Sequence, residues 1–203
     1  VDLQRFVEAG RASGREPADM TGIARPRVGF IGGIDAHTFD PELYLEVVRR
    51  IPDAQFVLVG GSSLPEGWCP RRNVHMLGRK PYDEIAGYMA AMDVLIMPWN
   101  RSDWIKACNP VKLKEYLATG RAVVTTDFSA LGPWRPYVSV ADGAAEFAAA
   151  VRRALEAGRR PIAPALADML SRETWDDKAM LVLDTLDEVT SGGAAGVMRS
   201  RAA

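Results

Sequence analysis

Residues 93–126, DVLIMPWNRSDWIKACNPVKLKEYLATGRAVVTT, alternate between apolar runs and a helical period. Residues 93–99 form an almost uninterrupted apolar run, and residues 122–126 form a second run that is rich in β-branched side chains. Between them, residues 110–119 repeat their apolar side chains at helical spacing. Continuous apolar runs are typical of strands covered on both faces, so this stretch predicts a βαβ unit of a parallel sheet.

The same alternation extends over most of the 203 residues. It is typical of an α/β fold with a doubly wound, mostly parallel, six-stranded sheet and helices on both of its faces. Such sheets bind ligands in the loops beyond the carboxyl ends of their strands, so we expect the functional residues there. The predicted strands are residues 27–33, 54–60, 73–77, 93–99, 122–126 and 137–141, and the predicted helices are residues 41–50, 82–92, 110–119, 144–157 and 164–189.

Residues 26–190 are expected to form one folded unit. The length of 203 residues fits one domain with irregular ends, since a domain commonly holds about 100 to 200 residues. Residues 11–25 are polar and interrupted by glycine and proline, which predicts a linker. Residues 191–203 show no apolar face and are expected to form a flexible tail. Because the chain starts with Val1 rather than Met, we expect a fragment of a longer protein.

The composition excludes several classes of protein. Lys and Arg together number 25 and Asp and Glu 26, so the net charge of −1 provides no basic field for nucleic acid. Two cysteines, Cys69 and Cys108, are too few for a disulfide framework, which favours a reducing compartment. No apolar run approaches the roughly 18 residues of a membrane helix, and the first residues do not resemble a signal peptide. We therefore expect a cytoplasmic location.

Gly32 and Gly33 directly follow the first predicted strand. A turn made of glycines lets backbone amides approach a phosphate, because no Cβ atom stands in the way. The order of the glycines fits neither the dinucleotide-binding fingerprint nor the P-loop. An ordinary turn without a ligand is therefore the alternative interpretation.

The start of the helix predicted at residues 110–119 is the stronger candidate site. Asn109 is expected to cap this helix, and Pro110 suits its first position. Lys112 falls in the first turn, where the helix dipole disfavours a cation, and a bound diphosphate would remove that conflict. Glu115 lies one turn further on the same face, where it would accept hydrogen bonds from a ribose diol. The alternative is a solvated helix face on which Lys112 and Glu115 form an ion pair.

The chain resembles the C-terminal, donor-binding domain of GT-B glycosyltransferases at residues 73–99, NVHMLGRKPYDEIAGYMAAMDVLIMPW, and 109–127, NPVKLKEYLATGRAVVTTD. The likeness is to the family 4 group of retaining enzymes that use nucleotide sugars, and it covers nearly the whole chain. It implies a Rossmann-like nucleotide-sugar-binding domain at residues 26–190. The opening VDLQRF resembles the point where the interdomain linker enters that domain, so residues 1–25 are expected to be an interdomain linker segment. An N-terminal, acceptor-binding half of the same protein would be the missing partner.

The resemblance implies roles for residues around the predicted helix start. Lys112 would contact the diphosphate of the donor and act as the catalytic residue. Asn109, Pro110 and Val111 would bind the same group through the start of the helix. Glu115 would bind the ribose hydroxyls, as does the second glutamate of the family's paired motif. The donor is then a nucleoside diphosphate sugar that acts as a substrate, and no cofactor is expected.

The loops after the first and third predicted strands would complete the donor site. The resemblance implies that Gly32 and Gly33 approach the diphosphate. Arg79 and Lys80 lie in a segment that resembles the loop bordering the nucleobase, and either could alternatively reach the diphosphate. Alternatively, Arg79 and Lys80 are ordinary solvated charges before a helix and bind no ligand. The basic pair that the family usually carries near its glycine loop is absent from residues 34–40.

The family's first glutamate falls at Ala107, so the usual carboxylate contact to the donor sugar is missing. A subset of the family with the pattern N-P-x-K-x-x-E-Y is the better match. His37 and His75 stand alone and no D-x-D triplet occurs, so neither a metal site nor a metal-dependent GT-A transferase is predicted. Three tryptophans in predicted loops at the carboxyl edge would stack on a base or sugar, or pack beneath the loops: Trp99, Trp104 and Trp134.

The sequence thus predicts the donor-binding half of a metal-independent, retaining glycosyltransferase that is inactive as an isolated fragment. The Ala- and Arg-rich composition suggests a bacterial pathway in which a cell-surface polysaccharide or glycolipid is the acceptor. Peripheral contact with the inner face of the cell membrane would come from the missing half. Two alternatives stay open. One is a nucleotide-sugar epimerase of the same fold, and the other, kept open by Ala107, is a non-catalytic nucleotide-binding or interaction domain.

Overall fold

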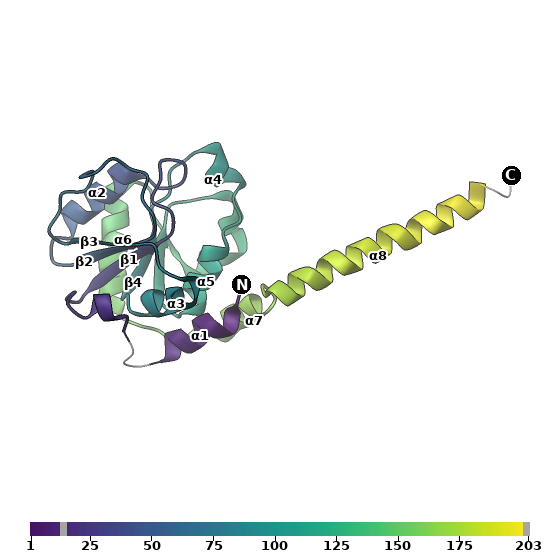
Figure 1. Cartoon of the computed structure of the whole chain (residues 1–203), viewed down its shortest axis with the longest axis horizontal. Coiled ribbons are helices and arrows are strands. Elements are labelled where there is room, and N and C mark those ends of the chain that lie inside the picture. Colours follow the sequence, from purple (N-terminus) through teal and green to yellow (C-terminus); the bar gives the residue numbers. More distant parts are fainter. Residues whose placement is uncertain (13–15, 201–203) are drawn as a thin grey trace.

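The computed structural model describes residues 1–12 and 16–200, and of residues 191–200 it describes the backbone only. One sheet with helices on both faces forms the body of the molecule, and the last helix extends away from it (Figure 1). The strands are β1 (Arg27–Ile31), β2 (Gln55–Val59), β3 (Val74–Gly78), β4 (Val94–Met97), β5 (Ala122–Thr125) and β6 (Ser139–Val140). The α-helices are α1 (Leu3–Arg11), α2 (Pro41–Arg50), α3 (Tyr82–Ala90), α4 (Asp103–Ala107), α5 (Val111–Ala118), α6 (Gly143–Ala157), α7 (Pro164–Ser171) and α8 (Trp175–Ser200), with 3-10 helices η1 (Ala18–Met20) and η2 (Ser129–Tyr137).

The six strands form one parallel sheet in the order β3-β2-β1-β4-β5-β6. This is the strand order of doubly wound nucleotide-binding folds, so the predicted α/β class is confirmed. Every residue of β1 and of β4 is buried, as their continuous apolar runs require. Helices α2 and α6 pack against each other on one face of the sheet, whereas α3 and α5 cover the other face together with α1 (Figure 1).

The end of the sheet differs from the prediction. Residues 137–141 were expected to form a strand, but β6 covers only Ser139–Val140. The preceding residues form η2, which contains Pro133 and Pro136. Proline has no N–H group to donate to a strand ladder, so the chain pairs with β5 only after these residues. The sequence prediction was therefore wrong about the length of the sixth strand.

The long helix predicted at residues 164–189 is two helices, α7 and α8. The break falls where Glu173 pairs with Lys114, the two side chains approaching to 2.6 Å. Thr174 then caps α8, because its hydroxyl oxygen accepts a hydrogen bond from the N–H of Asp177 at 3.1 Å. A single helix was the wrong prediction, since helical periodicity does not report a tertiary contact at its midpoint.

The segment predicted as a linker, residues 1–25, contains a helix that packs on the domain. Helix α1 lies against α3 and α5, and the side chain of Phe6 is fully buried. Gly10 approaches α5 so closely that a Cβ atom there would lie 2.4 Å from the carbonyl oxygen of Thr119. The packed unit thus extends to the N-terminal side of Pro26. The interdomain role of residues 1–25 stays a prediction.

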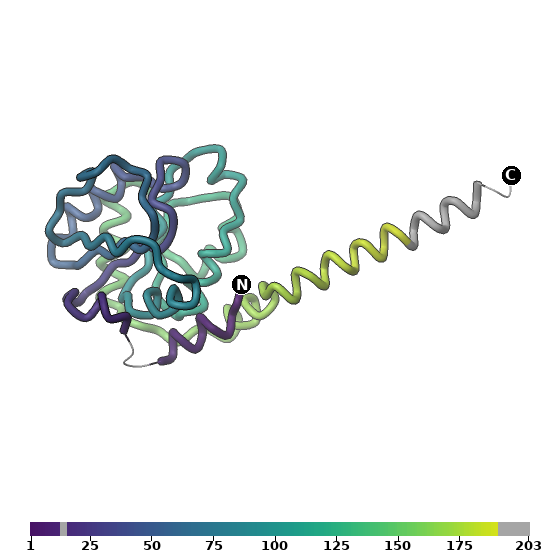
Figure 2. The backbone as a smooth tube through the Cα atoms, in the orientation of Figure 1, coloured from purple at the N-terminus to yellow at the C-terminus, as the bar shows by residue number. Residues whose placement is uncertain are grey.

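Helix α8 extends beyond the body of the molecule (Figure 2). The predicted tail at residues 191–203 lies outside the residues whose side chains are described. None of the helices in the described part of the chain combines the length and the apolar character that a bilayer-spanning segment requires. Seven apolar side chains of α8 are 54% to 67% exposed: Trp175, Met180, Leu181, Val182, Leu183, Leu186 and Val189.

Candidate functional site

The loops after β1, β2 and β3 meet at the carboxyl edge of the sheet. The N–H of Gly32 donates to the carbonyl of Val59 at 2.8 Å, and the N–H of Gly60 donates to the carbonyl of Gly78 at 2.8 Å. A Cβ atom on Gly60 would lie 1.8 Å from the carbonyl oxygen of Gly32. Only glycine permits this approach, and the contact fixes the loop that begins at Gly32.

Asp35 organises the rest of the loop after β1. Its Oδ1 accepts hydrogen bonds from the N–H groups of His37 at 2.9 Å and Thr38 at 3.1 Å. Its Oδ2 would lie 2.8 Å from a Cβ atom on Gly33. Gly33 therefore lies against a carboxylate of its own loop.

Tyr116 anchors α5 to the end of β1. The N–H of Ile31 donates to the Tyr116 hydroxyl at 2.7 Å, and this hydroxyl donates to the carbonyl of Ile31 at 3.2 Å. Burial raises the pKa of Tyr116 far above its ordinary value, so the hydroxyl remains protonated. The anchor holds the first turn of α5 beside the loop after β1.

The start of α5 differs from the predicted one. The helix begins at Val111, and Pro110 occupies the N-cap position, where it has no side-chain acceptor. Asn109 is not the cap, because its Oδ1 accepts a hydrogen bond from the ammonium of Lys114 at 3.3 Å. The amides of the first turn therefore lack a side-chain cap. Uncapped amides at a helix N-terminus are suited to bind an anion.

Lys112 reaches from the first turn of α5 toward the loop after β1. A Cβ atom on Gly32 would lie 3.0 Å from Cε of Lys112 and 3.5 Å from its Nζ. Within the described part of the chain, this ammonium has no hydrogen-bond or ion-pair partner. Burial lowers the pKa of Lys112, and the negative charge of Glu115 partly opposes this effect. A cation without a counter-ion, next to helix amides, fits an anionic ligand.

Glu115 lies one turn further along α5 and is 7% exposed. Burial raises the pKa of this carboxyl group, while Lys112 and the Tyr82 hydroxyl counteract the rise. That hydroxyl donates to Oε1 of Glu115 at 3.4 Å. Among the ion pairs of the described residues, none joins Lys112 to Glu115, so the solvated ion pair considered from the sequence does not form. The carboxylate retains the capacity to accept further hydrogen bonds.

The two basic residues after β3 lie in different places. Arg79 lies over the loop after β2, since a Cβ atom on Gly61 would be 2.5 Å from its Nε. Lys80 forms an ion pair with Asp19 of η1 at 2.6 Å, and its ammonium lies 5.5 Å from the ring centre of Tyr88. The structure therefore brings Arg79, and not Lys80, to the glycine loops.

A sequence model of the family "Glycosyl transferases group 1" matches residues 25–157. The matched range contains all six strands of the sheet together with Gly32, Lys112 and Glu115. The chain belongs to this family. A Bacillus subtilis (strain 168) protein, named as the teichuronic acid biosynthesis glycosyltransferase TuaH, is 33% identical over 117 residues, which are 55% of this chain and 29% of that protein.

Solved structures of other glycosyltransferases share the fold. Sucrose-phosphate synthase from Thermosynechococcus elongatus superposes with a TM-score of 0.68 at 20% identity, over 94% of this chain and 51% of that one. The Anabaena protein HepE, in complex with UDP and glucose, superposes with a TM-score of 0.65 at 16% identity, over 91% of this chain and 54% of that one. These likenesses show a Rossmann-like fold shared with GT-B enzymes. The chain spans about half the length of both structures and less than a third of the Bacillus relative.

Position 107 lies at the end of α4, a helix that the sequence analysis missed. Ser102 caps α4 by accepting a hydrogen bond from the N–H of Ile105 at 3.4 Å. Ala107 is its last residue, so no carboxylate stands at this position. Lys106 forms an ion pair with Asp103 at 2.8 Å and is therefore not an unpaired cation beside α5. The helix has five residues, too few for a recognisable period.

Lys114 is the functional-site neighbour that sequence reasoning missed. It is buried, pairs with Glu173 at 2.6 Å, and its ammonium lies 6.0 Å from the ring centre of Trp134. Burial alone would raise the pKa of Glu173, but its bonds to Lys114 and Lys178 outweigh this and lower it. The pair fastens the outer side of α5 to the turn before α8. The only local sign of this role in the sequence is that Lys114 is a basic residue within a helical pattern of apolar residues.

The tryptophans at the carboxyl edge mainly serve packing. Trp99 and Trp134 are buried, and the ring of Trp99 packs against Phe128 with 5.2 Å between their centres. Trp104, on α4, is 68% exposed. Packing is therefore the role of two of these three tryptophans, and Trp104 alone among them is available for contact with a ligand or partner.

In the part of the chain that the structure describes, no three His, Cys, Asp or Glu side chains converge as metal ligands.

Proposed function

We propose that this chain is the donor-binding half of a glycosyltransferase and binds the diphosphate of a nucleoside diphosphate sugar. The observation that carries the proposal is the ammonium of Lys112, which lies beside Gly32 at the start of α5 and has no partner among the described residues. Backbone amides and an ammonium are the donors that a diphosphate requires. The nucleotide sugar acts as a substrate, and the proposed reaction uses no cofactor.

Lys112 would act mainly by stabilising the leaving group. In the transfer, the bond between C1 of the sugar and the diphosphate oxygen breaks, and its electron pair stays on the diphosphate. A new bond joins C1 to the acceptor hydroxyl oxygen, whose proton passes to the departing diphosphate. The charge of Lys112 and the amides of Val111 and its neighbours would stabilise the negative charge that develops on the diphosphate.

Glu115 and Arg79 would position the nucleoside part of the donor. The Glu115 carboxylate is buried and oriented by the Tyr82 hydroxyl, so it would accept hydrogen bonds from a ribose diol. Arg79 borders the loop after β2, beside which the base or the diphosphate would lie. Since Ala107 supplies no carboxylate, the sugar would be held without the usual glutamate. Retention of configuration and independence from metal ions are further parts of the proposal and are supported by the family resemblance.

We further propose that an acceptor-binding half completes the enzyme. The chain spans about half the length of related glycosyltransferase structures, which supports this division. The exposed apolar side chains of α8 support it as well, because an apolar surface of this extent is usually covered. The Bacillus relative favours a bacterial cell-surface polysaccharide or glycolipid as the acceptor, with the enzyme in the cytoplasm at the inner face of the membrane.

Thermal unfolding of the chain with UDP, GDP, dTDP, ADP and CMP tests the donor site. A nucleotide at about 100 times its dissociation constant should stabilise the fold by about 2.7 kcal/mol. One nucleoside diphosphate should raise the midpoint, and the Lys112→Ala and Glu115→Gln variants should lose this shift. Lys80→Ala is the matched control, because Lys80 is paired with Asp19 and should leave the shift unchanged.

The same lysine variant in the full-length protein tests the catalytic role. Transfer to the acceptor should fall by a factor of about 100 or more, as when one charged stabiliser of a transition state is removed. Full transfer activity in Lys112→Ala would contradict the proposed role of Lys112. A nucleotide shift that persists in this variant would place the nucleotide elsewhere.

A further inference from the structure

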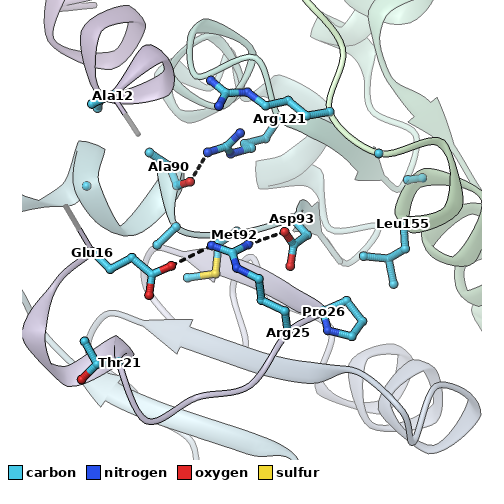
Figure 3. A pocket seen from close by; sticks show the side chains of 16 residues that line it. Ala12, Glu16, Thr21, Arg25, Pro26, Ala90, Met92, Asp93, Arg121 and Leu155 are labelled. Carbon is cyan, nitrogen blue, oxygen red and sulfur yellow. Dashed lines mark hydrogen bonds and ion pairs between the residues drawn. The ribbon is translucent and has the colours of Figure 1, made fainter. Parts of the chain in front are cut away.

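A cavity of about 1050 Å³ lies at the amino edge of the sheet, opposite the loops of the proposed donor site (Figure 3). It is lined by residues that stand directly before strands, including Asp93 before β4 and Arg121 before β5. The carboxyl ends of α3 and α6 complete the wall with Ala90 and Leu155. Small-molecule sites commonly have volumes of about 300 to 1,000 Å³, so the cavity is large enough for a ligand.

The carboxylates of this cavity are already engaged. Arg25 forms an ion pair with Glu16 at 2.8 Å and a second ion pair with Asp93, and Figure 3 shows the guanidinium between them. Glu16 also pairs with the buried Arg27 at 3.0 Å, and Asp93 accepts a hydrogen bond from the N–H of Arg27 at 2.7 Å. The negative charge that lines the cavity is thus neutralised by Arg25 and Arg27.

The other two arginines of the cavity, Arg121 and Arg159, pair with no carboxylate in the described part of the chain. Arg121 donates through Nη2 to the carbonyl of Ala90, but its Nε is buried and has no acceptor. Burial, followed by the charge of Arg159, lowers the pKa of Arg121 to about 10, although Asp93 opposes the effect. Buried N–H groups without a partner are uncommon and destabilising, so this wall lacks an acceptor.

We propose that the cavity binds a small molecule with a phosphate monoester, whose phosphate lies between Arg121 and Arg159. The phosphate oxygens would accept hydrogen bonds from the guanidinium groups of Arg121 and Arg159, and the dianion would balance the two guanidinium charges. The body of the ligand would lie against the apolar side chains of Pro26, Met92 and Leu155. Because this site is at the amino edge of the sheet, it is separate from the proposed donor site and independent of it.

A titration with inorganic phosphate, followed by thermal unfolding at constant ionic strength, tests the proposal. Phosphate should raise the midpoint of the wild-type chain more than chloride does. Arg159→Gln should weaken the apparent affinity by about tenfold or more, as the loss of a charged hydrogen bond predicts. This arginine is exposed, so the variant should fold normally, and Arg121→Gln should act in the same direction. Arg160→Gln is the matched control, since Arg160 is also exposed and does not line the cavity.

Lys112→Ala separates this site from the donor site, and it should leave the phosphate effect in place. Three results would overturn the proposal. The wild-type chain could show no shift with phosphate, or Arg160→Gln could lose as much affinity as Arg159→Gln. The third is a shift that disappears in Lys112→Ala and persists in Arg159→Gln, which would assign the phosphate to the donor site.

Discussion

The two edges of one sheet offer different groups to an anion. At the carboxyl edge, Lys112 lies beside the backbone of Gly32 and has no counter-ion among the residues that the structure describes. At the amino edge, Arg25 ties Glu16 to Asp93. In a parallel sheet, the helices that follow strands direct their amide ends to the carboxyl edge and their carbonyl ends to the amino edge. An anion therefore meets backbone N–H groups at one edge and depends on guanidinium side chains at the other.

This difference predicts which changes should destabilise each edge. The carboxyl edge depends on close backbone approaches that only certain residues permit, so it should be sensitive to added atoms. The amino edge depends on partly exposed ion pairs, so it should be sensitive to salt. Substitutions at the two edges should therefore differ both in size and in salt dependence.

The largest expected effect is at the glycine loops. Gly60 has a φ of +148°, and a Cβ atom there would lie 1.8 Å from the carbonyl oxygen of Gly32. Gly60→Ala should destabilise the fold by about 3 kcal/mol or more in urea denaturation, independently of salt. Gly132→Ala is the control, because a Cβ atom there would meet nothing within 4 Å, and it should change stability by less than about 0.5 kcal/mol. Equal stabilities of the two variants would refute the close-approach argument.

Removal of the anchor between α5 and β1 should have the next largest effect. Tyr116→Phe leaves the buried N–H of Ile31 without its acceptor, which should cost about 1–3 kcal/mol of stability. Affinity for the nucleotide should fall as well, because the anchor positions the first turn of α5. Tyr137→Phe is the control, since its hydroxyl makes no hydrogen bond within the described residues. Unchanged stability and affinity in Tyr116→Phe would show that α5 is positioned by packing alone.

A smaller effect is expected at the amino edge. Arg25→Met removes two ion pairs whose arginine side chain is 47% exposed, so solvent screening limits the loss to about 1 kcal/mol. The loss should shrink when denaturation is repeated in about 1 M salt, where charges are screened within about 3 Å. A loss that does not respond to salt would mean that Arg25 acts by packing, and the contrast between the edges would fail.

The smallest effect is expected at Glu115 and should have the opposite sign. Burial raises the pKa of this carboxyl group in the folded chain above its ordinary value of 4.5, so folding favours the protonated form. The cost of burying its charge is fully present above the folded pKa and disappears as the pH falls toward 4.5. Glu115→Gln should therefore be slightly more stable than the wild-type chain at pH 7, and the difference should vanish near pH 4. A less stable variant at pH 7 would mean that the charged form is the favoured one.

Local patterns were sufficient for most of the fold. Strands such as β1 and β4 are buried on both faces, and their uninterrupted apolar runs report this directly. Patterns failed where a long-range contact decides the structure, as at Glu173, whose pairing with Lys114 divides α7 from α8. They also failed at η2 and α4, because these elements lack an apolar period long enough to recognise.

The candidate site was predictable only in part, for the same reason. Lys112 and Glu115 are marked by their places near a helix start, which is a local property. The pairing of Lys80 with Asp19 joins segments 61 residues apart, so local patterns could not distinguish Lys80 from Arg79 as a donor-site residue. The orphaned Nε of Arg121 depends on the burial of its wall by α3 and α6, which no local pattern reports.

The sequence by itself determined the α/β class, most of the strands and the presence of the helix that carries Lys112 in its first turn, because apolar periodicity is local. Tertiary structure decided which charges are paired and which are left unpaired. Within the described part of the chain, Lys112 lacks a partner because α5 is fastened beside Gly32, and Arg121 lacks a carboxylate because the nearby ones bind Arg25 and Arg27. Ion pairing depends on distances between segments far apart in the chain, and only the packed sheet sets those distances.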